Sequence, residues 1–343
     1  MGDLIDVRII VVTYNSQSDI AECLTSLAAQ VGVSIEIVVV ENASKDQTAE
    51  IISSRFPFVK MIQNVNNLGF VRGCNQGLVD CRSRYVAFVN PDTLSELEWL
   101  RSAVATIELN SRAGVCQPKI LLFDDRKIVS SVGNKANFLF FAWSQGYGVS
   151  DDQISSPSRV SFASGCAALY KRECLEKTQG LDEAFVMYGD DVDLGIRCFV
   201  LGYDITYSPM SIVYHKYRFK ESPQKYFLLE RNRLMILLKI YRLQTLLLFV
   251  PILLVSEIGV VLKSLRDGWF SSKLASYGSV MRNWQHIRRG RSLVQLSRVR
   301  SDSDVIEFLE GPMSFSAFSG SILIRVGNKL LERYRSFLLS MRL

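Results

Sequence analysis

The sequence lacks the features of a secreted or disulfide-bonded protein. Its seven cysteines include no Cys-x-x-Cys motif and show no paired spacing, which predicts reduced and mostly buried thiols. The first residues carry neither a basic segment nor a cleavage site, and a strand-like run begins almost at once. We therefore expect a cytoplasmic protein.

Two phosphate-binding signatures are also missing. The glycines of Gly69-x-x-x-Gly73-x-x-x-Gly77 do not follow the order Gly-x-Gly-x-x-Gly, and no Gly-Lys-Ser/Thr occurs after them. This argues against a Rossmann cofactor site and a P-loop. Four-residue spacing places the glycines on one face of a helix, where they allow either tight packing on a sheet or the close approach of a ligand.

Negative charge is scarce in the last third of the chain. Residues 1–224 carry 21 Lys and Arg against 26 Asp and Glu, whereas residues 225–343 carry 19 against 8. A basic tail rich in Leu and Phe predicts an anionic surface as its partner, and without a DNA- or RNA-reading motif we expect a membrane rather than nucleic acid. We expect two regions, an α/β domain over residues 1–224 and a basic helical extension over residues 225–343.

The extension has no uncharged run long enough to span a bilayer. Residues 245–256 are uncharged but contain Pro251, and a span of about 20 residues from Leu243 to Leu262 must include Glu257. A charged residue at the bilayer centre costs about 2.5–3.5 kcal/mol. The sequence favours interfacial attachment, although a re-entrant hairpin is compatible with it, and a last helix over residues 322–343 adds basic amphipathic surface.

Strand, loop and helix alternate along the first region. Apolar runs that suit strands are followed by polar loops and then by helical spacing, and these runs cover residues 7–12, 34–40, 59–63 and 85–89. Units of this length predict a parallel sheet with right-handed crossovers. The periodicity weakens over residues 114–160, where we expect a lid or substrate loop.

The fourth strand ends abruptly in a carboxylate, Asp92. No polar residue marks a solvent face in residues 85–89, which predicts a strand buried on both sides. In open α/β sheets the ligand crevice lies outside the carboxyl ends of the strands, so Asp92 can hold a hard metal ion there. Asp92 could instead cap a helix over residues 94–109.

Carboxylates gather again over residues 182–193. Helical spacing of the apolar residues that follow places Asp190 and Asp191 in a first helical turn. The helix dipole favours acidic residues there, and Asp193 with Arg197 makes an i, i+4 pair, so these carboxylates have either a structural role or a role in a site.

Two further strands are expected, over residues 203–207 and 211–215. His215 is one of two histidines and sits where the second of these strands ends. It is either a structural hydrogen-bonding group or a ligand of a metal ion beside the acidic residues.

Several motifs occur in a fixed order along residues 7–235. They are Val12-Thr13-Tyr14-Asn15, Val40-Glu41-Asn42-Ala43-Ser44-x-Asp46, Asn67-Leu68-Gly69-Phe70-x-x-Gly73-x-Asn75-x-Gly77, Asn90-Pro91-Asp92, Ser164-Gly165, Asp182-Glu183-x-Phe185-x-Met187-Tyr188-x-Asp190-Asp191-x-Asp193-Leu194, His215 and Arg231-Asn232-Arg233. In this order they resemble the inverting family-two glycosyltransferases, particularly the rhamnosyltransferase-like branch. The resemblance implies the GT-A fold, a Rossmann-like α/β fold whose mainly parallel sheet is flanked by helices.

The resemblance also implies a site for a nucleotide-sugar donor. Thr13, Tyr14 and Asn15 would line the nucleobase pocket, and Glu41, where the family usually has Asp, would accept from the N3–H of uracil or thymine. The ribose and diphosphate would lie against Asn67, Gly69, Arg72 and Asn75. Gly165 would complete the donor-binding set together with Asp190, which would bind hydroxyls of the donor or of the acceptor.

A metal ion and a base are implied in the same way. Asp92 would be the remaining acid of the family's Asp-x-Asp motif, whose first position is Asn90 here. Together with His215 it would hold Mn²⁺ or Mg²⁺ against the diphosphate. Asp191 matches the family's general base, which deprotonates the incoming hydroxyl.

The implied activity is transfer of a sugar, rhamnose for example, from a dTDP- or UDP-sugar to a glycan or polyprenyl-linked acceptor in cell-surface polysaccharide synthesis. We expect the protein on the inner face of the cell membrane. A glycoside hydrolase would also use two carboxylates but needs no nucleotide site. A sugar-nucleotide pyrophosphorylase and a membrane-bound nucleotide-sugar sensor that does not catalyse transfer are two further functions to weigh against transfer.

Overall fold

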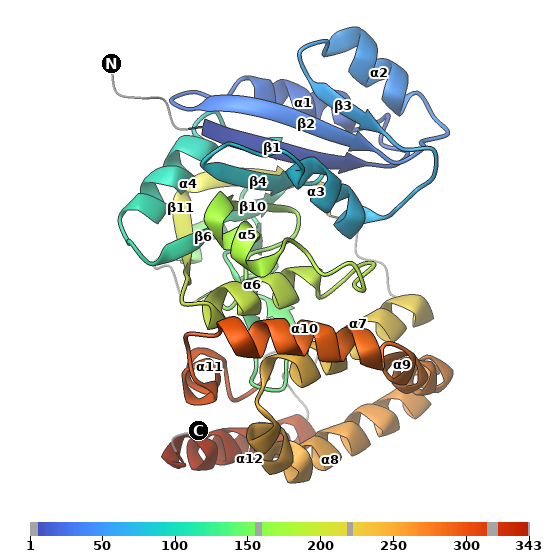
Figure 1. Ribbon diagram of the computed structural model, residues 1–343, viewed down its shortest axis with the longest axis vertical. Coiled ribbons are helices and arrows are strands. Elements are labelled where there is room, and N and C mark those ends of the chain that lie inside the picture. The colour runs from blue at the N-terminus through green and yellow to red at the C-terminus, as the bar shows by residue number, and fades with distance from the viewer. Residues whose placement is uncertain (1–5, 155–159, 218–221, 314–321, 342–343) are drawn as a thin grey trace. The chain divides into compact units, whose positions relative to one another are not determined.

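The computed structural model describes residues 6–154, 160–217, 222–313 and 322–341 (Figure 1). The chain divides into two compact units, the first made of residues 1–134, 144–198 and 203–218 and the second of residues 135–143, 199–202 and 219–343. The expected boundary after residue 224 lies close to the observed one, but two short segments from the front of the chain belong to the second unit. Residues 1–5 and the end of the predicted last helix, residues 342–343, lie outside the described parts.

The first unit is built on a nine-stranded mixed sheet with the strand order β3-β2-β1-β4-β10-β6-β11-β5, and β7 pairs with β6. Helices follow most of the strands, as the alternating pattern predicts. The elements are β1 (Asp6–Thr13), α1 (Ile20–Ala28), β2 (Ser34–Glu41), α2 (Thr48–Arg55), β3 (Lys60–Gln63), α3 (Phe70–Leu78), β4 (Tyr85–Val89), β5 (Thr93–Ser95), α4 (Trp99–Glu108), β6 (Ala113–Leu122), β7 (Val129–Ser131), η1 (Asp151–Gln153), β10 (Ala167–Lys171), α5 (Arg172–Thr178), α6 (Asp190–Val200, whose last two residues belong to the second unit) and β11 (Asp204–His215).

Strands β1 to β4 are parallel to one another, as predicted. Because side chains alternate along a strand, Val7, Ile9 and Val11 of β1 join the core that α1 and α4 cover. The intervening Ile10 and Val12 face α3 on the other side of the sheet. The sheet is therefore buried on both faces at its centre, which explains the uninterrupted apolar runs.

The glycines of α3 serve mainly to pack this helix on the sheet. A Cβ added at Gly73 would lie 2.7 Å from Cγ1 of Val12, and one at Gly77 would lie 2.6 Å from Cγ2 of Ile10. Tight packing, rather than the approach of a ligand, therefore explains these two positions. Gly69 differs, because it precedes the helix and has a φ of 83°.

Residues 114–160 are more regular than expected, since they contain most of β6 and all of β7. Strand β6 was not predicted from the sequence, because the strand contains Pro118. Proline cannot donate to a strand ladder, and the register of the neighbouring β11 shifts between Ser208 and Ile212, opposite Pro118 and Lys119. The single irregular strand β11 takes the place of the two strands that we expected over residues 203–207 and 211–215.

The helix expected over residues 94–109 begins only at Trp99. Thr93 to Ser95 instead form β5, which pairs antiparallel with β11 at the edge of the sheet. Because Glu98 is the residue that precedes α4, Asp92 does not cap it, and the interpretation of Asp92 as a helix cap is wrong.

The second unit is mostly helical. It comprises α7 (Pro223–Ile240), α8 (Leu243–Arg266), α9 (Phe270–Arg282), α10 (Trp284–Ser297), α11 (Asp302–Phe308) and α12 (Ile322–Ser340), with most of the two-stranded sheet of β8 (Asn134–Ala136) and β9 (Ala142–Ser144). The aromatic segment 138–143 packs here, with the Phe138 and Phe249 rings 5.6 Å apart and Tyr241 Oη donating to the Phe138 carbonyl at 2.9 Å.

Helix α8 runs without a break through Pro251. The re-entrant hairpin considered from the sequence is therefore not formed. Among the described residues α8 is the one helix that is long and apolar enough to cross a membrane by length and composition, and only 17% of its most hydrophobic window is buried.

Candidate active site

The loops that follow β1 and β2 are tied together at the carboxyl ends of these strands. Thr13 and Glu41 are register partners, and the Asn42 amide donates to the Thr13 carbonyl at 2.9 Å. The amide of Asn15 donates to Oγ of Ser44 at 2.9 Å, and the Lys45 amide donates to Oδ1 of Asn15 at 2.8 Å. The structure thus brings the four predicted nucleobase residues together, and Tyr14 is 44% exposed.

The two polar residues on the strands themselves are buried. Glu41 is 1% exposed, and its Oε1 accepts from the Ser44 amide at 2.7 Å. Thr13 is fully buried. These two side chains shape the loops, while Tyr14 and Asn15 form their exposed surface.

The predicted diphosphate residues lie at the start of α3 and support a second loop. Asn67 Oδ1 accepts from the Gly69 amide at 2.8 Å, and Nδ2 of Asn42 donates to the Gly69 carbonyl at 3.2 Å. Gly69 is thereby fixed beside the end of β2, in a backbone conformation that suits glycine.

Arg72 and Asn75 reach from α3 to the segment that precedes α6. Arg72 forms an ion pair with Glu183 at 3.3 Å. Asn75 holds Leu181 twice, since Nδ2 donates to its carbonyl at 2.9 Å and Oδ1 accepts from its amide at 3.0 Å. In this structure both residues therefore position the loop that leads to the acidic pair.

Asp190 and Asp191 begin α6 as predicted. Oδ1 of Asp191 accepts from the Val192 amide at 2.9 Å, and its Oδ2 accepts from the Gly165 amide at 3.3 Å. Asp190 is 8% exposed. Two residues with positive φ, Tyr188 at 62° and Gly189 at 79°, turn the chain into the helix.

Burial and like charge govern the protonation of this pair. Burial, with the neighbouring Asp191, raises the pKa of Asp190 to about 8. Burial also raises the pKa of Asp191 to about 6, although the amides of Val192 and Gly165 oppose the shift. The two carboxyls titrate as a coupled pair, and near neutral pH the pair carries about one proton.

Asp193 differs from its two neighbours. It is fully buried and pairs with Arg197 at 2.7 Å, so the structural role considered for this pair from the sequence is confirmed. Nη1 of Arg197 also donates to the carbonyls of Thr178 and Gly180, at 2.6 and 3.0 Å. This pair fixes α6 against the loop that Asn75 holds from the other side.

Asp92 and His215 meet where β4 and β11 end. Oδ1 of Asp92 lies 3.4 Å from Nε2 of His215, and the Lys216 amide donates to the Asp92 carbonyl at 3.0 Å. Burial lowers the pKa of His215, but Cys166 and Asp92 outweigh it and raise that pKa to about 10. The side chain of Asp92 is 38% exposed, so it remains accessible to a ligand.

The segment 164–166 joins these parts into one site. The Gly165 amide donates to Asp191, whereas the Cys166 carbonyl accepts from the Asn90 amide at 2.8 Å and the Cys166 side chain is close enough to His215 to raise its pKa. Gln117 Oε1 holds the start of the segment by accepting from the Ser164 amide at 2.6 Å. The candidate base and the Asp92–His215 pair therefore face the same three-residue turn.

The family profile that describes glycosyl transferase family 2 matches residues 8–178. The chain belongs to this family.

Several other glycosyltransferases match parts of the chain. An uncharacterised glycosyltransferase of Haemophilus influenzae is 33% identical over 30% of this chain and 33% of its own length. The pre-mycofactocin glycosyltransferase of Mycobacterium tuberculosis is 24% identical over 62% of this chain and 43% of its own length. The chain thus spans less than half the length of these two relatives. The N-acetylglucosaminyl-diphospho-decaprenol L-rhamnosyltransferase of the same organism is 23% identical, over 60% of this chain and 75% of its own length.

Solved structures confirm the predicted GT-A fold. Residues 1–349 of S. aureus TarS in complex with UDP superpose with a TM-score of 0.53 at 19% identity, covering 98% of this chain and 91% of that one. The mannosyltransferase PcManGT of Pyrobaculum calidifontis, in complex with GDP-Man and Mn²⁺, gives a TM-score of 0.51 at 14% identity, covering 98% and 88%. At these identities the likeness concerns the fold alone.

Cys166 is a site residue that the motifs did not reveal. It directly follows Ser164-Gly165, but its importance depends on β10 running antiparallel to β4, which places Cys166 beside Asn90. A parallel sheet, as predicted, gives no reason to place these two residues together. Cys166 could have been identified from the sequence only if the antiparallel pairing of β10 with β4 had been predicted.

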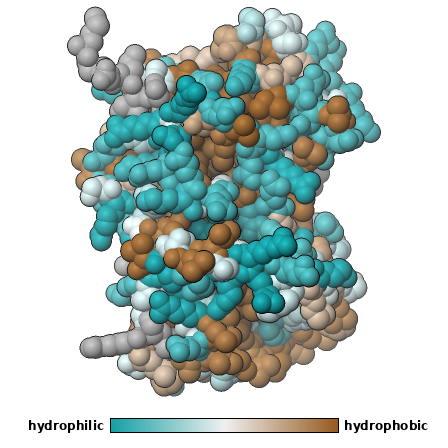
Figure 2. All heavy atoms as spheres, in the orientation of Figure 1, coloured by the Kyte–Doolittle hydropathy of each residue, from teal (hydrophilic) through white to brown (hydrophobic). Residues whose placement is uncertain are grey.

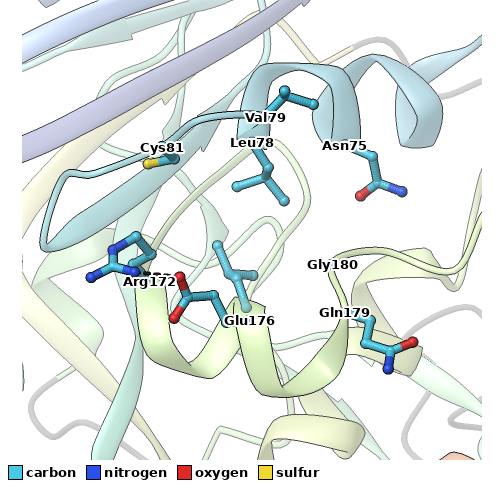
Figure 3. Close-up of a pocket in the computed structure, with 9 residues that line it drawn as sticks. Asn75, Leu78, Val79, Cys81, Arg172, Glu176, Gln179 and Gly180 are labelled. Carbon is cyan, nitrogen blue, oxygen red and sulfur yellow. Dashed lines mark hydrogen bonds and ion pairs between the residues drawn. The ribbon is translucent and has the colours of Figure 1, made fainter.

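A separate hollow of about 330 Å³ lies between α3 and α5 (Figure 3). Figure 3 shows Arg172 and Glu176 pointing toward each other at its rim, where they form an ion pair. Asn75 is the one predicted site residue that lines it. The candidate active site is thus defined by the contacts around residues 164–166 rather than by this hollow.

Proposed function

We propose that this family-two glycosyltransferase is a metal-dependent, inverting enzyme that transfers a sugar from a dTDP- or UDP-sugar, rhamnose for example, to a hydroxyl group. The turn at residues 164–166 carries the proposal, since it contacts both Asp191 and His215. A base for the acceptor and a pair of metal-binding atoms near the donor are the two requirements of this chemistry.

Asp92 and His215 suit a divalent cation. A cation would have to displace the proton that His215 holds, and the pair would then offer one oxygen and one nitrogen atom, which lie 3.4 Å apart. The side chain of Asp92 is partly exposed. Over the described ranges no three His, Cys, Asp or Glu side chains are grouped as a metal site. The remaining ligands would therefore come from the donor diphosphate and water, with Mn²⁺ or Mg²⁺ as the ion. When bound, the ion neutralises the charge that develops on the departing diphosphate.

Asp191 is the group that would accept the proton of the incoming hydroxyl. With a pKa of about 6 it is ionised near neutral pH, and the amides of Gly165 and Val192 orient its carboxylate. Asp190, with a pKa of about 8, keeps its proton and can donate to a sugar hydroxyl. Attack from the side opposite the diphosphate inverts the anomeric centre.

A surface at the ends of β1 and β2 would hold the nucleotide. Tyr14 and Asn15 are exposed there, and the buried Glu41 fixes the adjoining loop through Ser44. Asn67 and Gly69 lie next to it at the start of α3, where close approach of the ribose and diphosphate is possible. Arg72 is exposed enough to reach a phosphate if its pair with Glu183 opens.

The acceptor would be a glycan or a polyprenyl-linked sugar at the inner face of the cell membrane. Two observations support this part: a similar protein is named as a decaprenol-linked rhamnosyltransferase, and residues 225–343 carry an excess of 11 positive charges. A basic surface attracts anionic lipid headgroups and would place the enzyme beside a lipid-linked acceptor.

The test is donor binding followed by thermal unfolding with dTDP-, UDP- and GDP-sugars, each with and without Mn²⁺. We expect a dTDP- or UDP-sugar to raise the midpoint temperature of unfolding when Mn²⁺ is present. In Asp92→Ala we expect the sugar to raise this temperature no further with Mn²⁺ than without it. Asp152→Ala, an exposed carboxylate on η1, is the matched control. An unchanged Mn²⁺ effect in Asp92→Ala rules out the metal site, and tight binding without turnover favours a sensor.

A further inference from the structure

Helix α8 presents a row of hydrophobic side chains to solvent. The residues recur at intervals of three or four, so they share one face of the helix. Each is between 45% and 66% exposed, and the set is Leu243, Leu247, Val250, Leu254, Ile258, Leu262 and Leu265. We call this set the α8 row. In Figure 2 hydrophobic side chains gather along α8, at the lower end of the view.

Other side chains of α8, beside and opposite the α8 row, fasten the helix to the rest of the second unit along its whole length. Near its start, Thr245 donates to Asp302 at 2.5 Å, and the Leu248 carbonyl accepts from Tyr334 Oη at 2.5 Å. In its second half, Glu257 forms ion pairs with Arg233 and Lys273. Near its end, Ser264 is fully buried.

These attachments oppose a membrane-spanning role for α8. To span a bilayer the helix would have to leave the unit and separate Glu257 from Arg233 and Lys273, both of which are nearly or fully buried. Breaking a buried pair in this way is strongly destabilising, and the freed carboxylate would also enter the membrane. A helix fastened on one face and hydrophobic on the other is suited to lying along an interface.

Charge favours a lipid surface over a second copy of the chain. Arg242 is exposed at the start of α8, and α12, which lies beside α8 and is joined to it through Tyr334, carries exposed Arg325, Lys329 and Arg333. Two copies meeting at this face would bring like charges together, whereas anionic headgroups would neutralise them.

We propose that α8 lies flat in the membrane surface, with the α8 row in the acyl boundary and its polar face within the protein. The proposal deepens the membrane attachment suggested above and rests on it. It places Glu257 on the protein side of the helix, where its partners Arg233, Lys273 and Tyr277 lie.

The first experiment is flotation of the full chain with vesicles of phosphatidylcholine containing about 30 mol% phosphatidylglycerol. Leu254→Glu introduces a charge in the middle of the α8 row. Leu296→Glu is the matched control, because Leu296 is 85% exposed on α10 of the same unit. We expect the partition coefficient to fall by at least about tenfold in Leu254→Glu and to change by less than about twofold in the control. Equal loss in both variants, or loss in neither, overturns the proposal.

A second experiment separates a flat helix from a spanning one. Gln244→Cys and Arg266→Cys place exposed thiols at the two ends of α8, in a chain whose half-buried Cys81 has been changed to Ser. The protein is added to sealed vesicles and treated with a membrane-impermeant maleimide. Labelling of both ends without detergent is expected. Protection of one end until detergent is added shows that α8 spans, and the proposal fails.

Donor hydrolysis is measured on the same preparations without vesicles. All α8 variants should hydrolyse the donor at the parent rate, because none of them changes a residue of the candidate active site. Absence of turnover in every preparation, including the parent, would refute the proposed enzyme while leaving the flotation result to decide the place of α8. Normal turnover with unchanged flotation would refute only the flat helix.

Discussion

Each unit of the molecule holds a pair of carboxylates of which one is buried and the other half-buried, and the two pairs are opposite in character. In the first unit no Lys or Arg of the described ranges pairs with Asp190 or Asp191, and burial raises their pKa values to about 8 and about 6. In the second unit Glu257 and Glu230 share Arg233 and Lys273. These cations outweigh burial and lower the pKa of Glu257 to about 2.

The difference shows that burial alone does not determine whether a carboxylate is ionised at neutral pH. A buried acid with cationic partners is ionised throughout the physiological range and serves mainly to hold helices together. A buried acid without such partners keeps a pKa near the working pH, where it can take up and release a proton. Compensation by a cation, rather than burial, separates the structural pair from the candidate catalytic pair.

The largest expected effect is on catalysis. Asp191→Asn keeps the shape of the side chain and removes the proton acceptor, so the rate of sugar transfer should fall by about 10²–10⁴. Donor affinity should remain within about twofold, because the proposed role of Asp191 concerns the acceptor. The measurement is steady-state transfer, with donor affinity from thermal shift. A variant that retains more than about a tenth of the rate, or a product that keeps the donor's anomeric configuration, contradicts the assignment.

The same kind of substitution in the other pair should affect stability instead. Glu257→Gln leaves Arg233 and Lys273 with one carboxylate, Glu230, and we expect a loss of roughly 3 kcal/mol in the free energy of unfolding. Urea denaturation measures this loss. The rate of donor hydrolysis per folded molecule should stay at the parent value.

A second substitution tests whether the loss comes from uncompensated charge. Removing one cation as well, in Glu257→Gln with Lys273→Met, should recover most of the stability, because Glu230 and Arg233 then remain as a balanced pair. Additive losses in the double variant would show that packing, and not charge balance, sets the cost.

The sequence predicted the four parallel strands well, because residues buried on both faces leave an uninterrupted apolar run. It also predicted that Gly165, Asp191, Asp92 and His215 belong to one locus, and the contacts around residues 164–166 bring them together. Their roles in donor binding and catalysis remain predictions. The strand β6 was missed because Pro118 interrupts its pattern, although β11 accommodates that proline through a register shift.

The orientation of α8 was not predictable from the sequence. A helix with one hydrophobic row has the same spacing whether the row faces a core or a membrane. In the sequence, Glu257 counted against a membrane helix because it is a charged residue within the apolar stretch. Its partners Arg233 and Lys273 lie on two other helices, α7 and α9, so the sequence does not show that the charge is paired. Only the fold shows that this carboxylate is paired on the protein side.

The dependence of stability on pH should have opposite signs in the two pairs. The folded pKa of Asp190, about 8, lies above the value near 3.9 of an unfolded chain, so its contribution is fully present below pH 4 and is lost as the pH rises through about 8. The folded pKa of Glu257 lies below its unfolded value, so its contribution is present above pH 4 and is lost as the pH falls through about 2.

Urea midpoints at about pH 5, 7 and 9 test this contrast. The parent should lose stability across this range, and Asp190→Asn should lose distinctly less, because the variant has no proton to release at that position. Glu257→Gln should follow the slope of the parent, since Glu257 is already ionised at pH 5. Parallel curves for the parent and Asp190→Asn would show that Asp190 is not protonated in the folded state.

The smallest expected effect comes from a carboxylate that has cationic partners but is exposed. Asp267, at the end of α8, pairs with Arg266 and Lys263, and these partners lower its pKa to about 2. Water and salt screen such a pair, so the urea midpoint of Asp267→Asn should not differ measurably from that of the parent. Asp267 caps the helix that carries Glu257, and each has two cationic partners. The main difference is the burial of those partners, since Arg233 and Lys273 are 4% and 0% exposed whereas Lys263 and Arg266 are 32% and 72% exposed. If Asp267→Asn lost as much stability as Glu257→Gln, the number of cationic partners would set the cost regardless of burial, and the distinction drawn between the two buried pairs would lose its basis.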